Sequence, residues 1–490
     1  MRIGGAGVGT LAYAAFRGDL PDTMLEQLMR GAVSVDNGRV RITDEGAIAS
    51  GKMDELVRAA VFGDQDERDY ARWLIWETGQ AAGVVPSSIH ELYMARGRGE
   101  TGGYTVPAIN IRGMTYDTAR SVFRTAIKLE AGAFICEIAR SEIAYTDQRP
   151  SEYVAVVMAA ALREGWRGPL FIQGDHFQVS AKKFAADPET EVEAVRQLIR
   201  EAVAAGFYNI DIDTSTLVDL SKPDLDEQQR LNYEEAAKLA RFVRDLQPEG
   251  IDISLGGEIG EVGTENSTVE ELHSYMQGFN RTLQEIAPGV AGLSKISVQS
   301  GTTHGGVVLA DGTIADVQID LGTLERLSAV AREEYGLSGA VQHGASTLPD
   351  TAFHNFPRTE TAEIHLATNF QTMLYDRLPP GLRDEVYEWL RGNAKDERKE
   401  TDSDEQFFYK TRKKALGPFK QRFWDLDDDV KTELASAYDA KFGFLFTQLG
   451  IAGTARDVAV HVKPVLQHRT QPHEGMATVA AAPDDADLSD

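Results

Sequence analysis

The sequence predicts a (β/α)8 TIM barrel with a mostly helical N-terminal extension and further helices after the barrel. Two observations predict it: short apolar runs alternate regularly with helical stretches, and polar residues recur where the runs end. Eight runs over about 260 residues match the size of such a barrel. The predicted strands are 106–111, 133–139, 169–175, 208–213, 253–259, 295–300, 339–344 and 362–368.

The segments between these runs carry apolar residues at helical spacing. The predicted helices are 116–129, 151–164, 189–205, 233–246, 269–286 and 323–335, and the link after 339–344 is the least clearly helical. An open, doubly wound sheet is the alternative arrangement. The barrel is favoured because it brings the carboxyl ends of different strands together, whereas an open sheet spreads them along a row.

Four regions are expected along the chain. They are a helical extension (1–85), the barrel (86–378), a helical region (379–470) and a disordered acidic tail (471–490). Helices are predicted at 54–62 and 67–82 in the extension and at 384–391 and 427–449 after the barrel, with a solvated loop at 395–405.

Composition limits the function classes. The 490 residues carry a formal net charge of -26, which argues against binding nucleic acid or an anionic membrane, but a small phosphorylated substrate needs only one or two basic groups. Cys136 is the single cysteine, so no disulfide framework is expected. The start resembles no signal peptide, and the longest apolar run, 154–162, is too short to span a bilayer. We expect a soluble, cytoplasmic protein.

Residues typical of a metal site lie at four predicted strand ends. Asp175 and His176 end one run, and Glu258, His304 and His343 end or follow three others. Three imidazoles and a carboxylate suit Zn²⁺ or another divalent ion with a position open to substrate, which leaves Asp175 to move a proton. Such an ion could stabilise an enediolate during cleavage of a carbon–carbon bond, or generate hydroxide for hydrolysis. Composition alone does not separate these two reactions.

Six short motifs, in order, resemble the class II, metal-dependent fructose-bisphosphate aldolases over residues 105–449. They are VPAIN, GDH, IDTS, Glu258-Ile-Gly, SKIS…GTTHG and HG-x-S. The resemblance implies reversible, zinc-dependent cleavage of a ketose bisphosphate in glycolysis or gluconeogenesis. Fructose 1,6-bisphosphate, cleaved to dihydroxyacetone phosphate and glyceraldehyde 3-phosphate, is the default substrate.

The resemblance also implies roles for individual residues. His176, His304 and His343 match the metal ligands, Glu258 a carboxylate associated with the metal, and Asp213 a position near a secondary metal site. Asp175 matches the acid/base at the C4 hydroxyl, and Glu265 lies one position away from a catalytic glutamate of a mobile loop. Positions that match substrate contacts are Asn110, Ser141, Gly305, Gly344, Ser346, Thr368 and Arg412, the last being an arginine lent to a neighbouring subunit. A homodimer or higher homo-oligomer and a possible monovalent cation are therefore expected as well.

The last strand departs from the family pattern. The family reads Asn-x-Asp-Thr, whereas this chain reads His365-Leu-Ala367-Thr368, and Ala345 and Thr347 replace two glycines after His343. His365 thus takes a substrate-facing position, and the pocket is expected to be altered. Alternatives left open are an aldolase for another ketose phosphate such as tagatose bisphosphate, a non-catalytic metal- or sugar-phosphate-binding barrel, and a hydrolase. A Schiff-base aldolase is disfavoured, because Lys295 lies at the start of its strand.

Overall fold

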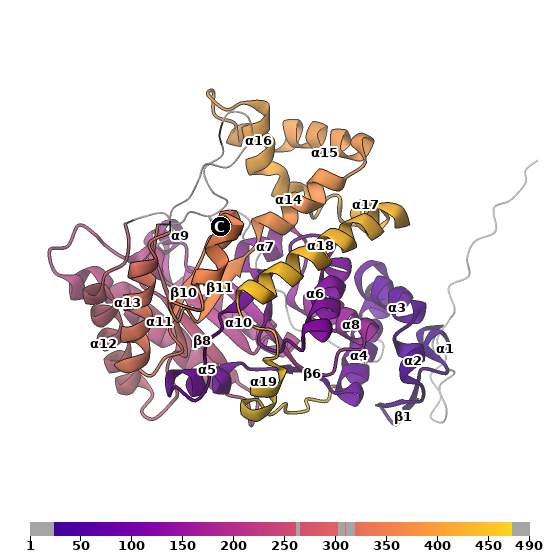
Figure 1. The fold of residues 1–490 in the computed structure, drawn as a ribbon, viewed down its shortest axis with the longest axis horizontal. Coiled ribbons are helices and arrows are strands. Elements are labelled where there is room, and N and C mark those ends of the chain that lie inside the picture. Colours follow the sequence, from indigo (N-terminus) through magenta and orange to yellow (C-terminus); the bar gives the residue numbers. More distant parts are fainter. Residues whose placement is uncertain (1–23, 261–264, 302–308, 310–318, 473–490) are drawn as a thin grey trace, which may run out of the picture.

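The computed structural model describes residues 24–260, 265–301, 309 and 319–472. Its centre is a closed barrel of eight parallel strands (Figure 1). The strands are β4 (Val106–Asn110), β5 (Ile135–Ala139), β6 (Gly168–Gln178), β7 (Asn209–Asp213), β8 (Ser254–Glu258), β9 (Lys295–Val298), β10 (Ala340–Gln342) and β11 (Glu363–Leu366). The last strand pairs with the first, with His365 opposite Ala108. This closure confirms the predicted barrel and excludes the open sheet.

The predicted helices surround the barrel with ends within a few residues of those expected, except that α11 starts eight residues earlier. They are α6 (Thr115–Leu129), α8 (Pro150–Glu164), α10 (Pro188–Ala205), α11 (Leu225–Leu246), α12 (Val269–Ile286) and α13 (Leu321–Glu333). Local signals explain several of the ends: Asp187 and Thr268 cap α10 and α12, and Gly165 and Gly206 end α8 and α10 in the left-handed conformation. Shorter elements are α7 (Arg140–Tyr145), α9 (Ala181–Ala186), η1 (Ser215–Leu217), η2 (Ala345–Thr347), η3 (Asp350–Asn355) and α14 (Thr368–Arg377).

The N-terminal part packs against one side of the barrel. It contains α1 (Met24–Met29), β1 (Val33–Asp36), β2 (Arg39–Ile42), α2 (Glu45–Ile48), α3 (Gly51–Phe62) and α4 (Gln65–Ala82). Because α3 and α4 cover α8, that helix is buried almost all round, which explains its continuous apolar run. The β1–β2 hairpin was not predicted, although Asn37-Gly38 at its turn is a strong hairpin signal, and both residues have positive φ.

A short strand and a helix lead into the barrel at its amino end. β3 (Val84–Ser87) pairs with the start of β6 outside the barrel, and α5 (His90–Gly97) follows it. From α5, Tyr93 donates a hydrogen bond to Glu363, and Arg96 donates to backbone carbonyls that precede β4, β10 and β11. α5 therefore closes the amino end, opposite α14 (Figure 1).

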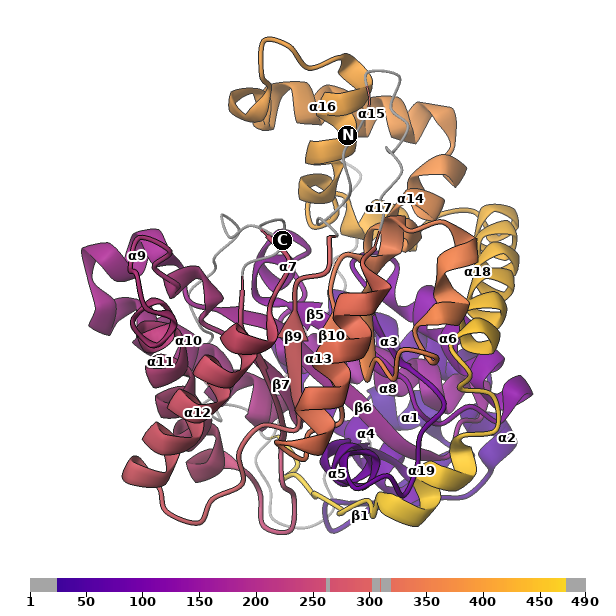
Figure 2. The same cartoon turned by 60° about the vertical axis from the view of Figure 1, so that its left-hand side comes forward.

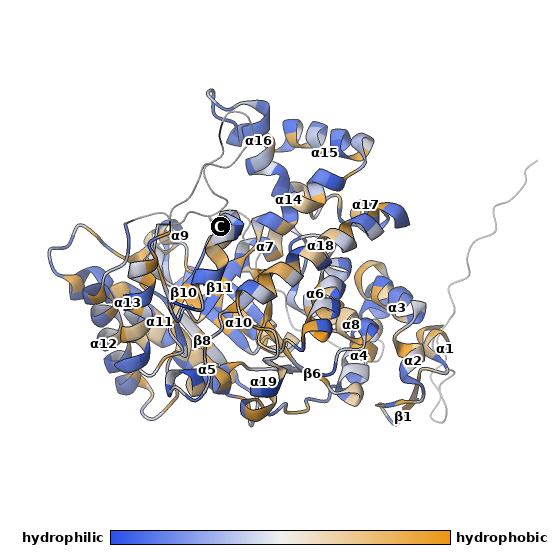
Figure 3. Ribbon diagram, viewed as in Figure 1, coloured by the Kyte–Doolittle hydropathy of each residue, from blue (hydrophilic) through white to orange (hydrophobic). Residues whose placement is uncertain are grey.

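The C-terminal helices are α15 (Pro380–Asn393), η4 (Lys395–Glu397), α16 (Asp404–Thr411), η5 (Arg412–Ala415), α17 (Lys420–Trp424), α18 (Asp428–Gln448) and α19 (Ala455–His461). Figure 2 shows α15 and α16 standing above the carboxyl end of the barrel, and hydrophilic residues dominate α16 in Figure 3. The chain then returns to the N-terminal part, where Trp73 Nε1 donates to the Arg469 carbonyl at 3.1 Å. Within the described residues, no helix combines the length and apolar character needed to cross a membrane.

Candidate active site

A bulge in β6 turns two adjacent side chains into the barrel. Between Gly174 and Phe177, β6 has one more residue than β7 beside it, and His176 adopts φ of 40°. A side chain at Gly174 would place its Cβ 2.4 Å from the Phe177 ring, so only glycine fits the bulge. Neighbouring strand residues normally face opposite sides, but here Asp175 and His176 both reach the interior. The strained backbone at His176 is of the kind that gathers at functional sites.

Three of the predicted metal residues gather around one point. Donor atoms of His176, Glu258 and His343 all lie within 4.8 Å of one another. Asp213 contacts His176 Nδ1 through Oδ2 at 2.8 Å, and Ser297 Oγ lies 2.9 Å from His343 Nε2. Such outer contacts orient imidazoles that bind metals. Two imidazoles and a carboxylate fit Zn²⁺ or a similar divalent ion. His304 and Gly305 lie outside the described residues.

The electrostatics of this group favour a positive charge. Burial and the Asp213 charge raise the pKa of Glu258 to about 7. Burial alone would lower the pKa of His176, but Asp175 and Glu258 raise it well above its usual value. Burial alone would raise the pKa of Asp213, yet hydrogen bonds with His176, Ser215 and Gln178 lower it. Buried negative charge therefore surrounds an imidazole, as expected where a cation binds.

Asp175 is held as a carboxylate beside this group. Asn110 Nδ2 donates to Asp175 Oδ2 at 2.8 Å and also to Glu142 Oε2 at 2.9 Å. On the other side, His365 Nδ1 lies 3.1 Å from Asp175 Oδ1. Burial opposes ionisation, but the positive charges of His176 and His365 hold the pKa of Asp175 well below its usual range. The lowered pKa keeps Asp175 ionised and able to accept a proton, although it also makes the carboxylate a weak base.

A second set of charged side chains lies below, toward the amino end of the barrel. We call Glu137, Asp211, Lys295 and Glu363 the interior layer; they come from β5, β7, β9 and β11, every second strand. In barrels such a layer usually consists of branched apolar side chains. Here Lys295 Nζ donates to Asp211 and Glu363, and Gln173 Nε2 donates to Glu137 Oε2 at 2.7 Å and to Glu363 Oε1 at 3.0 Å.

Lys295 forms ion pairs with Asp211 and Glu363 within the interior layer. The ion-pair partner of Glu137 is the His365 imidazole. Burial opposes ionisation of Lys295 and Glu363, yet attraction raises the pKa of Lys295 and lowers that of Glu363 to about 2. Gly256 in β8 leaves room for Lys295 and Asp211, because a Cβ at this position would lie 2.3 Å from Asp211 Oδ1. Sequence reasoning missed this layer, although a charged residue at inward positions of four apolar strands was a visible signal. As expected from the sequence, Lys295 begins β9, and its amine is buried and ion-paired.

The predicted substrate contacts lie at several places around the carboxyl end. Ser141 is buried in α7, Gly344 has φ of 68°, and Thr368 begins α14. Ser346 Oγ accepts a hydrogen bond from the backbone N–H of Ala367. Their roles in binding substrate stay predictions.

We call His176, Glu258 and His343 the metal group, and two other predicted residues lie apart from it. Glu265 is exposed, next to residues 261–264, which lie outside the described part. Arg412 is buried within its own chain: Nη2 donates to Thr372 Oγ1 at 2.6 Å, and the guanidinium lies over the rings of Tyr375 and Tyr409. Its predicted role as a substrate contact in a neighbouring subunit stays a prediction.

The chain is distantly similar to several solved structures. No curated protein matches the chain. Among solved structures, a putative fructose-1,6-bisphosphate aldolase from Coccidioides immitis has 16% identity and a TM-score of 0.46, covering 75% of this chain and 97% of its own. The YdjI aldolase from Escherichia coli K12 has 13% identity and a TM-score of 0.45, with coverages of 75% and 99%. The fructuronate-tagaturonate epimerase UxaE from Cohnella laeviribosi has 13% identity and a TM-score of 0.48, with coverages of 88% and 94%.

The family assignment comes from a family model. The model of the class-II fructose-bisphosphate aldolases matches residues 96–422, about two thirds of the chain, and starts after the N-terminal extension. The chain therefore belongs to the class-II fructose-bisphosphate aldolase family.

Proposed function

We propose that this protein catalyses reversible, metal-dependent aldol cleavage of a ketose bisphosphate, with fructose 1,6-bisphosphate as the default substrate. The observation that carries the proposal is the group of His176, Glu258 and His343 beside the ionised Asp175. Family membership supports divalent-metal dependence and a sugar-phosphate substrate.

His176, Glu258 and His343 would hold the metal, with His304 as a further predicted ligand. When bound, a divalent ion supplies the positive charge that stabilises the oxygens of an enediolate. Asp213 and Ser297 keep the imidazoles of His176 and His343 in position.

Asp175 exchanges the proton of the C4 hydroxyl. In the cleavage direction, its carboxylate accepts that proton as the bond between C3 and C4 breaks, and it returns the proton during aldol addition. Asn110 holds Asp175 Oδ2 and thereby fixes the direction of the carboxylate.

The test measures release of triose phosphate from fructose 1,6-bisphosphate with EDTA and after addition of Zn²⁺. We expect chelation to abolish cleavage, one equivalent of Zn²⁺ to restore it, and His176→Asn to prevent restoration. His354→Asn is the matched control, because His354 lies in η3, away from the metal group. Cleavage that persists after complete metal removal would contradict the proposal.

A second candidate is the same chemistry on another ketose phosphate, such as tagatose bisphosphate. The contact between Ser346 Oγ and the Ala367 N–H favours it, because a residue that matches a substrate contact is bonded to a position that departs from the family pattern. Activity on a different ketose phosphate, with none on fructose 1,6-bisphosphate, would support this candidate. If a metal-loaded, folded sample cleaves no ketose phosphate, the non-catalytic binding role gains support instead.

A further inference from the structure

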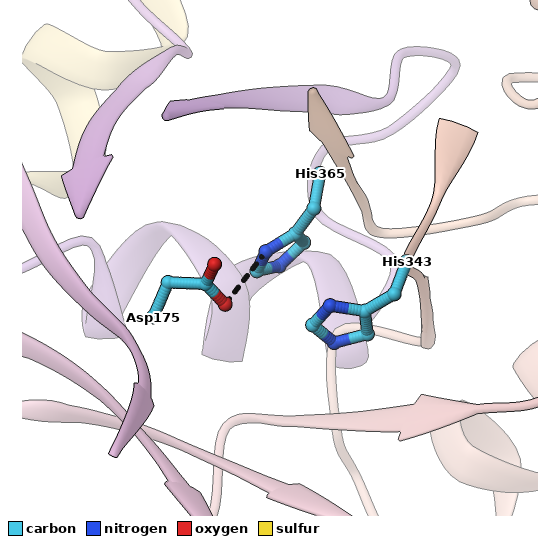
Figure 4. Close-up of side chains that lie close together, drawn as sticks. All are labelled: Asp175, His343 and His365. Atoms are coloured by element: carbon cyan, nitrogen blue, oxygen red, sulfur yellow. Dashed lines mark ion pairs between the residues drawn. The ribbon is translucent and has the colours of Figure 1, made fainter. Parts of the chain in front are cut away.

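His365 belongs to two groups of potential metal ligands that the function above does not use. One consists of Asp175, His343 and His365, and the other of Glu137, Asp175, Asp211 and His365. In each group the donor atoms lie within 4.8 Å of one another, and every residue is buried. Figure 4 shows Asp175, His343 and His365 pointing toward one another. Asp175 and His365 are common to both groups.

The distances around His365 Nδ1 are close to those within a coordination shell. This nitrogen lies 3.0 Å from Glu137 Oε1 and 3.1 Å from Asp175 Oδ1. Ligands about 2.0 Å from a tetrahedral zinc ion are separated by roughly 3.3 Å. Small shifts of three side chains would thus place Nδ1 and the two oxygens around one ion.

The other side of the His365 ring is oriented as in metal-binding histidines. His365 Nε2 lies 2.8 Å from Glu363 Oε1, and Glu363 is fixed by Lys295 and Tyr93. A carboxylate that accepts the N–H of one ring nitrogen leaves the opposite nitrogen for a metal. Asp213 has the corresponding contact with His176 in the first group.

The charge balance calls for a neutralising proton or a metal ion. Lys295 pairs with Asp211 and Glu363. Across the described part of the chain, the ion-pair partners of Glu137 and Asp175 are imidazoles only. Two buried carboxylates without a lysine or arginine partner are costly unless a proton or a metal ion neutralises them.

We propose that His365, Asp175 and Glu137 form a second divalent-metal position, toward the amino end of the barrel from the group of His176, Glu258 and His343. One imidazole and two carboxylates suit Zn²⁺ and related ions. An ion there binds Asp175 Oδ1 and withdraws this base from proton transfer. The second ion is therefore inhibitory; only this consequence rests on the proposed function.

The experiment titrates Zn²⁺ into the chelator-treated full-length protein by calorimetry, and Co²⁺ by visible absorption. The wild type is expected to bind two equivalents, and His365→Asn, which introduces the residue of the family pattern, only one. Glu137→Gln is also expected to lose the second equivalent. His354→Asn, as control, keeps both, and thermal unfolding checks that each variant folds.

Either of two results overturns the second position: one equivalent in the wild type, or two equivalents in folded His365→Asn. Activity distinguishes this outcome from failure of the proposed function. If the inference holds with the function, the wild type loses most of its activity as the second equivalent binds, and the Glu137→Gln variant does not. Two equivalents without aldol cleavage of any ketose phosphate leave the metal position standing and overturn the function instead. If the wild type cleaves a ketose phosphate but binds only one equivalent of metal, the proposed function stands and the second metal position is overturned.

Discussion

The metal group and the interior layer are both buried and charged, yet their charges are balanced in different ways. In the interior layer, Lys295 and its carboxylates are direct partners of one another. In the metal group, Asp213 and Ser297 contact one side of the imidazoles, and donor atoms of three residues converge on one point. Buried charge by itself therefore does not identify a site. Buried donor atoms that converge on one point without a lysine or arginine among them do.

The two regions also depend on each other. Glu363 accepts hydrogen bonds from Lys295 and Tyr93 and also contacts His365, which lies beside Asp175. Through Glu363, the interior layer therefore fixes the position of His365, which lies at one side of the active site. Changes in the metal group should affect chemistry, whereas changes at Lys295 and Glu363 in the interior layer should affect stability.

The largest effect is expected from Asp175→Asn. Loss of the base should reduce cleavage by about 10²–10⁴-fold. Zn²⁺ bound by His176, Glu258 and His343 should remain, measured by metal analysis of the purified variant. Loss of that ion together with activity would show that Asp175 serves the first metal position rather than proton transfer.

Lys295→Met should strongly destabilise the protein. It leaves Asp211 and Glu363 buried without their cation, which costs about 3–5 kcal/mol, measured by denaturant unfolding. Lys222→Met is the control: Lys222 pairs with Asp219 at the surface, and its loss should change stability far less. Equal effects of the two variants would refute the contrast between paired interior and surface charges.

Tyr93→Phe tests how α5 supports the interior layer. It removes a buried hydrogen bond to the Glu363 carboxylate and should cost about 1.5–3 kcal/mol of unfolding free energy. Tyr335→Phe removes a partly exposed contact with His273 and should cost less. The opposite order would contradict the support inferred for Glu363.

The smallest effect concerns pH. The pKa of Glu363 is about 2 in the fold and about 4.5 when unfolded, so its stabilising contribution is complete above pH 4.5 and is lost as pH falls toward 2. Between pH 5 and pH 3 the wild type should therefore lose more stability than Glu363→Gln. Parallel losses in chemical denaturation would show that Glu363 is not held as an ionised carboxylate.

Local patterns predicted most of the fold. The eight apolar runs became the eight barrel strands, and the helices followed their apolar periodicity and capping residues. Donor atoms of His176, Glu258 and His343, three of the predicted ligands, lie close together, because parallel strands bring their carboxyl ends to one rim. The β1–β2 hairpin was not predicted, although Asn37-Gly38 at its turn is a strong local signal for a hairpin.

The sequence by itself determined which residue types stand at the strand ends and therefore which kind of chemistry the barrel could perform. Only the tertiary structure decided which of them meet. The bulge after Gly174 turns Asp175 and His176 inward together, and closure places β11 beside β4, more than 250 residues earlier. The partners of Lys295 and the position of His365 follow from this closure. Such contacts depend on register and on side-chain direction across the barrel, and no local pattern along the chain contains them.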